Sequence, residues 1–234
     1  MLQAFFLTLQ LASPAQAATA DCTQEEIKAL TTVVQAMSRG DDEVFQRAEK
    51  GVRGPADGCL LFRIHRSSLL GWAEARRLAP KGGAVELLGP ARRSLEELEQ
   101  LKGGPLDLDV EYAQISIRAA IAAAQDERAE LELLLAHARD LAERLSARGR
   151  RAMWPRPFNL LAGELWFEVD RFEEARGAFE RAMKAELTAV ALVGLARALS
   201  RLGRQDEACD MYRHVRDATS SLREQARQEL ASCK

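Results

Sequence analysis

The amino-acid sequence predicts an all-α protein built from helical hairpins, with about ten to eleven helices in total. Hydrophobic residues make up 47% of the 234-residue chain but aromatic residues only 6%, so alanine, leucine and valine supply most of the apolar content. Alanine and leucine favour helices, whereas strands favour β-branched and aromatic side chains. The chain has only seven prolines, and no alternation of apolar and polar residues between turns indicates a β-hairpin.

Residues 1–17 have the layout of a secretory signal peptide. An apolar run over residues 2–12 precedes Pro14 and the small-x-small triplet at 15–17, and cleavage after Ala20 is the alternative. No Lys or Arg precedes the run, so a buried N-terminal helix or a start codon placed too late is the competing interpretation. The run is far shorter than the ~20 residues that span a bilayer, and no later segment predicts a transmembrane helix. We therefore expect a periplasmic or secreted protein.

Four cysteines, an even number, fit an oxidising compartment in which they form two disulfides. They are Cys22, Cys59, Cys209 and Cys233. Of the three pairings, joining Cys22 to Cys59 and Cys209 to Cys233 closes the shortest loops and holds each end of the helical stack. Four unpaired thiols are the alternative. No CxxC pair or nearby histidine indicates a zinc site or a redox motif.

Apolar residues at helical spacing predict a series of helices in an N-terminal region, residues 18–153, separated by glycine and proline clusters. The expected helices are 23–38, a helix that starts at Asp41 or Asp42, 59–78, 84–101 with a bend near Gly89–Pro90, 106–124 and 127–147. Thr23 and Glu26 indicate a capping box at the start of the first helix. Two prolines in the segment 154–158 form an extended elbow that leads into a C-terminal region, residues 154–234.

The C-terminal region contains two tandem copies of one pattern, 33 residues apart, between Asn159 and Val215. The first copy is Gly163, Trp166, Asp170, Phe172, Ala175, Phe179 and Ala182, and the second is Ala196, Leu199, Gly203, Gln205, Ala208, Tyr212 and Val215. Small residues let two helices of a hairpin approach closely, and an aromatic residue fills the space toward the next hairpin. The pattern resembles the tetratricopeptide repeat (TPR) clearly over residues 159–217 and only faintly upstream. The resemblance implies an α-solenoid, and residues 221–233 are expected to cap its end.

The TPR resemblance implies that the first helix of each hairpin lines a concave face that binds a protein or a peptide. The expected groove residues are Leu160, Glu164, Phe167, Glu168, Val190, Val193, Arg197 and Arg201. One subset of the family binds a C-terminal carboxylate through a clamp with two asparagines, and this chain has a single asparagine, Asn159. That clamp is therefore excluded. Arg197 and Arg201 lie one helical turn apart, either to bind an acidic segment or simply to be solvated.

Other residue patterns give little indication of catalysis, cofactors or metals. The net charge of −2 gives no general attraction to nucleic acid. His65, His137 and His214 stand far apart without a metal-binding spacing. The densest basic run is Arg144, Arg148, Arg150, Arg151 and Arg156. We interpret it as a positively charged helix end, favoured by the helix dipole, and contact with an anionic partner is the alternative.

These observations together predict a non-catalytic TPR scaffold of the bacterial cell envelope or exterior that binds a protein or peptide. The alternative is a permanently assembled structural subunit of an envelope complex or of a homo-oligomer. No catalytic residue, cofactor, metal site or nucleic-acid partner is expected, and the sequence does not indicate which protein is bound.

Overall fold

A computed structural model of the chain describes residues 22–26, 28–29, 32, 59–78, 88–152, 155–215, 220–231 and 233. Within these residues all regular secondary structure is helical, which confirms the predicted all-α class. The helices are α4 (Leu60–Leu78), α5 (Gly89–Glu99), α6 (Asp107–Ala124), α7 (Arg128–Ala147), α8 (Phe158–Glu168), α9 (Phe172–Ala185), α10 (Ala189–Arg201), α11 (Gln205–Arg213) and α12 (Ser220–Leu230). The predicted signal peptide, the helix expected from Asp41 or Asp42, and Trp154 of the elbow lie outside the described residues.

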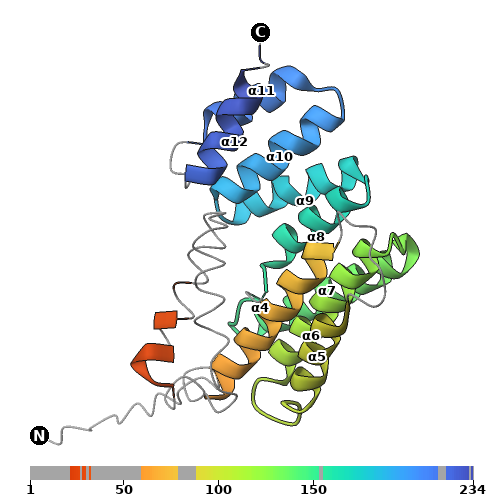
Figure 1. The fold of residues 1–234 in the computed structure, drawn as a ribbon, viewed down its shortest axis with the longest axis vertical. Coiled ribbons are helices and arrows are strands. Elements are labelled where there is room, and N and C mark those ends of the chain that lie inside the picture. The colour runs from red at the N-terminus through yellow and green to blue at the C-terminus, as the bar shows by residue number, and fades with distance from the viewer. Residues whose placement is uncertain are drawn as a thin grey trace, which may run out of the picture.

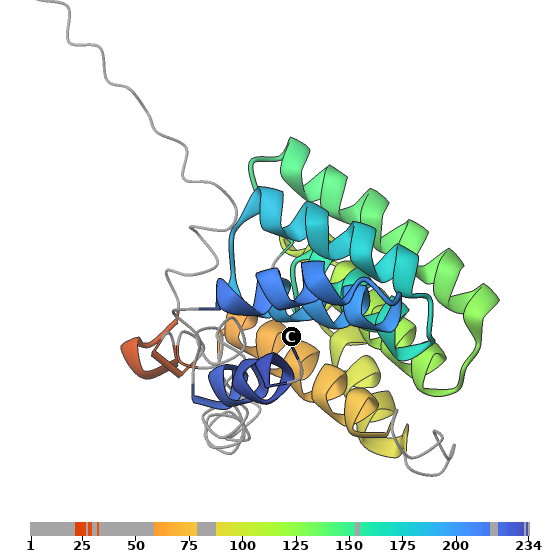
Figure 2. The ribbon, with the colours of Figure 1, turned by 90° about the horizontal axis from the view of Figure 1, so that it is seen from above.

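Successive helices pair as hairpins, α4 with α5, α6 with α7, α8 with α9, and α10 with α11, and the hairpins stack along the long axis of the molecule. Figure 1 shows α4 to α7 at one end, α8 and α9 in the middle, and α10 to α12 at the other end. Seen from above in Figure 2, α7, α9 and α11 lie on one side and α4 and α12 on the other. The second helices of three successive hairpins, α7, α9 and α11, therefore lie on the same side of the molecule.

Three hairpins turn with the same backbone geometry. Asp126, Asp170 and Gly203 each have a left-handed φ, of 56°, 58° and 77°. The amide of the next residue donates a hydrogen bond to a carbonyl five residues back, which closes the end of the first helix. The pairs are Glu127 to Ala122 at 2.9 Å, Arg171 to Trp166 at 2.9 Å and Arg204 to Leu199 at 3.0 Å. The α6–α7 hairpin thus has the same turn geometry as the two hairpins that the sequence pattern identified.

Phe179 of α9 is the central side chain of the C-terminal core, with 2% of its surface exposed. A Cβ atom added at Gly163 of α8 would lie 2.7 Å from its ring, and one added at Gly194 of α10 would lie 2.5 Å from it. Carbon atoms in contact stand about 3.5–4.0 Å apart, so both positions require glycine while the ring keeps its place. Phe179 therefore joins α8, α9 and α10 into one packed unit.

Helix α5 covers only the later part of the helix expected over 84–101 with a bend near Gly89–Pro90. It begins at Gly89 with Pro90 in its first turn, and residues 84–87 lie outside the described residues. Proline has no amide to donate, and amides in the first turn of a helix have no partner within it, so proline is well placed there. The glycine and proline therefore stand in the first turn of α5.

The cysteines stand in two pairs at disulfide distance. Cys22 is joined to Cys59 with a Cα–Cα distance of 5.0 Å, and Cys209 to Cys233 with a distance of 6.0 Å. Near the first pair the predicted capping box is present, because Glu26 accepts the Thr23 amide at 2.7 Å and its own amide donates to the Thr23 hydroxyl at 3.2 Å. Glu26 also accepts the Cys59 amide at 3.1 Å, which ties this first helical segment to the start of α4. None of the described helices is both long enough and apolar enough to cross a membrane.

Candidate binding groove

A groove of about 460 Å³ lies chiefly between α8 and α10, the first helices of the last two hairpins. Seven of the eight side chains that were expected to line a binding face lie along it, namely Glu164, Phe167, Glu168, Val190, Val193, Arg197 and Arg201. Leu160 does not. It is 7% exposed and packs in the C-terminal core with Phe179, because the first turn of α8 faces that core and the groove opens only from the next turn.

Residues from distant parts of the chain complete the groove. Arg76 of α4 closes one side, and Leu222 and Gln225 of α12 close another. Because Gly194 has no side chain, the groove extends down to the ring of Phe179. Sequence reasoning missed Arg76, Leu222 and Gln225 because nothing local indicates which helices pack beside α8 and α10. Gly194 could have been predicted as a packing position, since a glycine inside a helical pattern indicates a close approach by another group.

The inner side of the groove is a buried cluster of carboxylates and arginines. Arg76 contacts Glu164 at 2.5 Å and Glu168 at 2.6 Å, and Arg156 contacts Glu164 at 3.4 Å. The side chains of Glu164 and Glu168 are only 9% and 16% exposed. Burial raises the pKa of Glu168, and the charge of Arg76 opposes this rise. These ion pairs therefore hold α4 against α8, and both glutamates already have arginine partners within the protein.

The outer side of the groove is formed by two arginines that stack on aromatic rings. The guanidinium of Arg197 lies 4.3 Å from the ring centroid of Phe167, and that of Arg201 lies 4.3 Å from the centroid of Phe172. The two rings pack edge to face, with their centroids 5.4 Å apart. Stacking orders a guanidinium while leaving its N–H edge open to a carboxylate. Arg201 also contacts Asp170 at 3.3 Å.

Among the residues that line the groove three arginines stand with three carboxylates, and Arg156, which contacts Glu164 from outside the lining, adds a fourth cation. The cations are Arg76, Arg156, Arg197 and Arg201, and the anions are Glu164, Glu168 and Asp170. Each of these carboxylates has an arginine partner within the protein. Arg197 stacks on Phe167, and it is exposed on the α10 side of the groove. The groove thus combines apolar walls with an ordered, positively charged rim.

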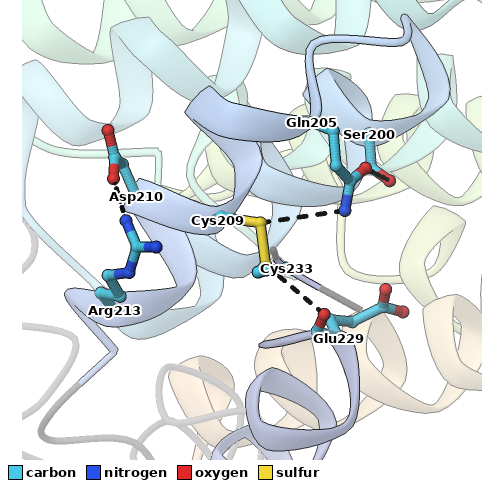
Figure 3. The surroundings of a disulfide bond; sticks show 7 residues. All are labelled: Ser200, Gln205, Cys209, Asp210, Arg213, Glu229 and Cys233. Atoms are coloured by element: carbon cyan, nitrogen blue, oxygen red, sulfur yellow. Dashed lines mark hydrogen bonds and ion pairs between the residues drawn. A yellow bond between two sulfur atoms is a disulfide. The ribbon is translucent and has the colours of Figure 1, made fainter. Parts of the chain in front are cut away.

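The Cys209–Cys233 disulfide joins α11 to the residues that follow α12, the helix that closes one side of the groove (Figure 3). Cys209 on α11 is 4% exposed, and Cys233 follows the end of α12. Gln205 lies 3.9 Å from the Cys209 sulfur through its Nε2 and accepts a hydrogen bond from Ser200 of α10 at 3.0 Å. The bridge therefore connects the last helix to α11 and, through Gln205, to α10.

The histidines do not form a site. Burial lowers the pKa of His65 to about 3, so this side chain is neutral at physiological pH. His137 lies on the surface, 3.3 Å from Glu111, and His214 is exposed. No cluster of three or more histidine, cysteine or acidic side chains suited to a metal ion occurs in the described part of the chain.

Four of the five arginines in the basic run contact different carboxylates in the structure. Arg144 contacts Asp140, Arg150 contacts Asp109, Arg151 contacts Glu186 and Arg156 contacts Glu164. These four arginines support local packing and helix pairing, and Arg148 is exposed.

No family model, no curated protein and no solved structure matches the chain.

Proposed function

We propose that the protein is a non-catalytic scaffold of the tetratricopeptide type that binds a protein or peptide segment. The observation that carries this proposal is the groove between α8 and α10, where Phe167, Val190 and Val193 provide apolar contacts and Arg197 and Arg201 an ordered cationic rim. Apolar walls favour binding by burial, and a few placed polar groups fix the register of the bound segment.

We place this activity in the bacterial cell envelope or outside the cell. The two cysteine pairs at disulfide distance support an oxidising compartment, in which such bonds persist. The signal-like residues 1–17 point the same way. A non-catalytic role is supported by the groove chemistry, since Glu164 and Glu168 are neutralised by arginines and stand beside no histidine of the described residues.

Selection of peptides from a random display library on the oxidised protein tests the proposal. We expect a selected peptide to bind the wild type and to lose most of its affinity for the double charge reversal Arg197→Glu/Arg201→Glu. The matched control is Arg204→Glu/Arg213→Glu, which reverses two exposed arginines of the α11 hairpin outside the groove. Equal loss in both variants, or recovery of no peptide at all, contradicts the proposal. Sedimentation velocity at micromolar concentration addresses the alternative of a self-assembling subunit, which requires association of the chain with itself.

A further inference from the structure

We propose that the Cys209–Cys233 disulfide keeps the groove in its binding-competent shape, so that reduction of this one bond weakens binding. This inference rests on the proposed function of the groove and deepens it by naming the element that controls it. The reductant is a dithiol, the chemical class that exchanges with protein disulfides.

Helix α12 forms one side of the groove. Leu222 and Gln225, three residues apart and therefore on the same face of the helix, line it together with Val190 and Val193 of α10. Ala226 is 3% exposed and packs in the C-terminal core, which places this face against the rest of the molecule. The groove has its observed shape only while α12 stays docked.

Helix α12 has little apolar surface to keep it docked. It is 11 residues long with the sequence SSLREQARQEL. Among the α12 side chains that the structure describes, Ala226 is the fully buried one, and Leu222 and Leu230 are partly buried against the core. Isolated helices shorter than about 12–15 residues are marginal in water, so α12 depends on tertiary contacts for its helical state as well as its position.

The disulfide provides a covalent link between the end of α12 and α11. On its α11 side, Cys209 is 4% exposed and sits between the buried residues Ala208 and Tyr212. On the other side, Cys233 lies just beyond the last residue of α12, Leu230. As Figure 3 shows, the bond ties the far end of α12 to a helix that is itself fixed in the core.

The switching step is a two-electron thiol–disulfide exchange. A thiolate of the dithiol attacks the sulfur of Cys233, which is more exposed than the buried Cys209. The S–S bond breaks, Cys209 leaves as a thiolate and takes up a proton, and a mixed disulfide remains on Cys233. The second thiol of the reductant then attacks this mixed disulfide, which releases Cys233 as a thiol and leaves the reductant as a cyclic disulfide. Two electrons and two protons have passed to the protein, and α12 is no longer held.

The test titrates a fluorescent peptide, selected on the oxidised wild type, into wild type, Cys209→Ala/Cys233→Ala and Cys22→Ala/Cys59→Ala. The last variant is the matched control, because Cys59 lies about 25 Å along α4 from Arg76 of the groove. If α12 is docked about a tenth of the time without its bond, affinity falls about tenfold in the Cys209/Cys233 variant, and the control keeps its affinity. Dithiothreitol is expected to weaken binding to the wild type and to the control, and to leave the Cys209/Cys233 variant unchanged.

Hydrogen exchange of residues 222–230 provides a readout that needs no ligand. We expect faster exchange in the Cys209/Cys233 variant with unchanged exchange in α10, which shows local undocking and not unfolding. Equal peptide affinity in this variant and wild type overturns the inference, and so does an equal loss in the Cys22/Cys59 control. If the oxidised wild type selects no peptide, the proposed function fails. Exchange then decides the inference by itself, and unchanged rates in α12 overturn it.

Discussion

Replacing Gly194 by alanine is expected to destabilise the protein, although alanine normally stabilises a helix. The added Cβ would lie 2.5 Å from the ring of Phe179, which is about 1 Å shorter than the usual distance between carbon atoms in contact. On its other side the ring packs so close to α8 that even a Cβ at Gly163 would lie 2.7 Å from it, which leaves little room for the ring to shift that way. Overpacking of this kind costs about 1–3 kcal/mol, which exceeds the ~1 kcal/mol that alanine gains over glycine in a helix.

The matched control is Gly177→Ala, in the middle of α9. A Cβ there meets only the end of the flexible Arg181 side chain, at 3.4 Å. This variant is expected to gain about 0.5–1 kcal/mol from helix propensity. Urea unfolding followed by circular dichroism measures both free energies of unfolding. The double variant Gly194→Ala/Phe179→Leu should recover part of the lost stability, because the smaller leucine side chain leaves room for the added Cβ. If Gly194→Ala is as stable as Gly177→Ala, the packing of Phe179 between α8 and α10 is wrong.

Three further predictions concern charge, pH and the terminal bridge. His65 has a folded pKa of about 3 against 6.5 when unfolded, so unfolding free energy should fall as the pH drops below 6.5, by at most about 1.4 kcal/mol per pH unit. Urea titrations of His65→Gln should show a flatter pH dependence than wild type, and parallel curves would contradict this assignment. Arg76→Met removes the charge that opposes the raised pKa of Glu168. We therefore expect a loss of stability that shrinks as the pH falls through this raised pKa, because the glutamate then takes up a proton; a loss that grows on acidification would argue against it. Cys209→Ala/Cys233→Ala should lower the global unfolding free energy by about 3 kcal/mol, since the bridge closes a loop of 24 residues; an unchanged denaturation midpoint would show that the bond does not constrain the chain.

The repeated C-terminal hairpins were readable from the sequence because close helix packing imposes a local residue pattern. Small residues recur where helices cross, and a residue with left-handed φ follows each first helix, as Asp170 and Gly203 show. The α6–α7 hairpin has the same turn, with Asp126 standing 44 residues before Asp170. It was hard to recognise because this spacing differs from 33 and because Leu131 and Leu135 replace the small and aromatic residues of the pattern.

Only part of the groove could be predicted from the sequence. Residues of α8 and α10 could be assigned to it because each helix has a regular face, but Leu160 was assigned one turn too early. The contact of Arg76 with Glu164 spans 88 residues of sequence and follows from the packing of α4, which no local pattern encodes. The same holds for α12, whose position depends on a disulfide and a few apolar contacts.

The most direct test of the central claim, that the groove between α8 and α10 binds a protein segment, is site-specific photo-crosslinking. A benzoylphenylalanine residue at Val190, in the groove, is compared with one at Glu173, on the surface of α9 outside it. We expect the Val190 position to form an adduct with the selected peptide and with a cellular protein, each competed by excess unlabelled peptide, and the Glu173 position to form neither. Adducts from Glu173 alone, or adducts from Val190 that excess peptide does not reduce, would contradict the assignment of the groove as the binding site.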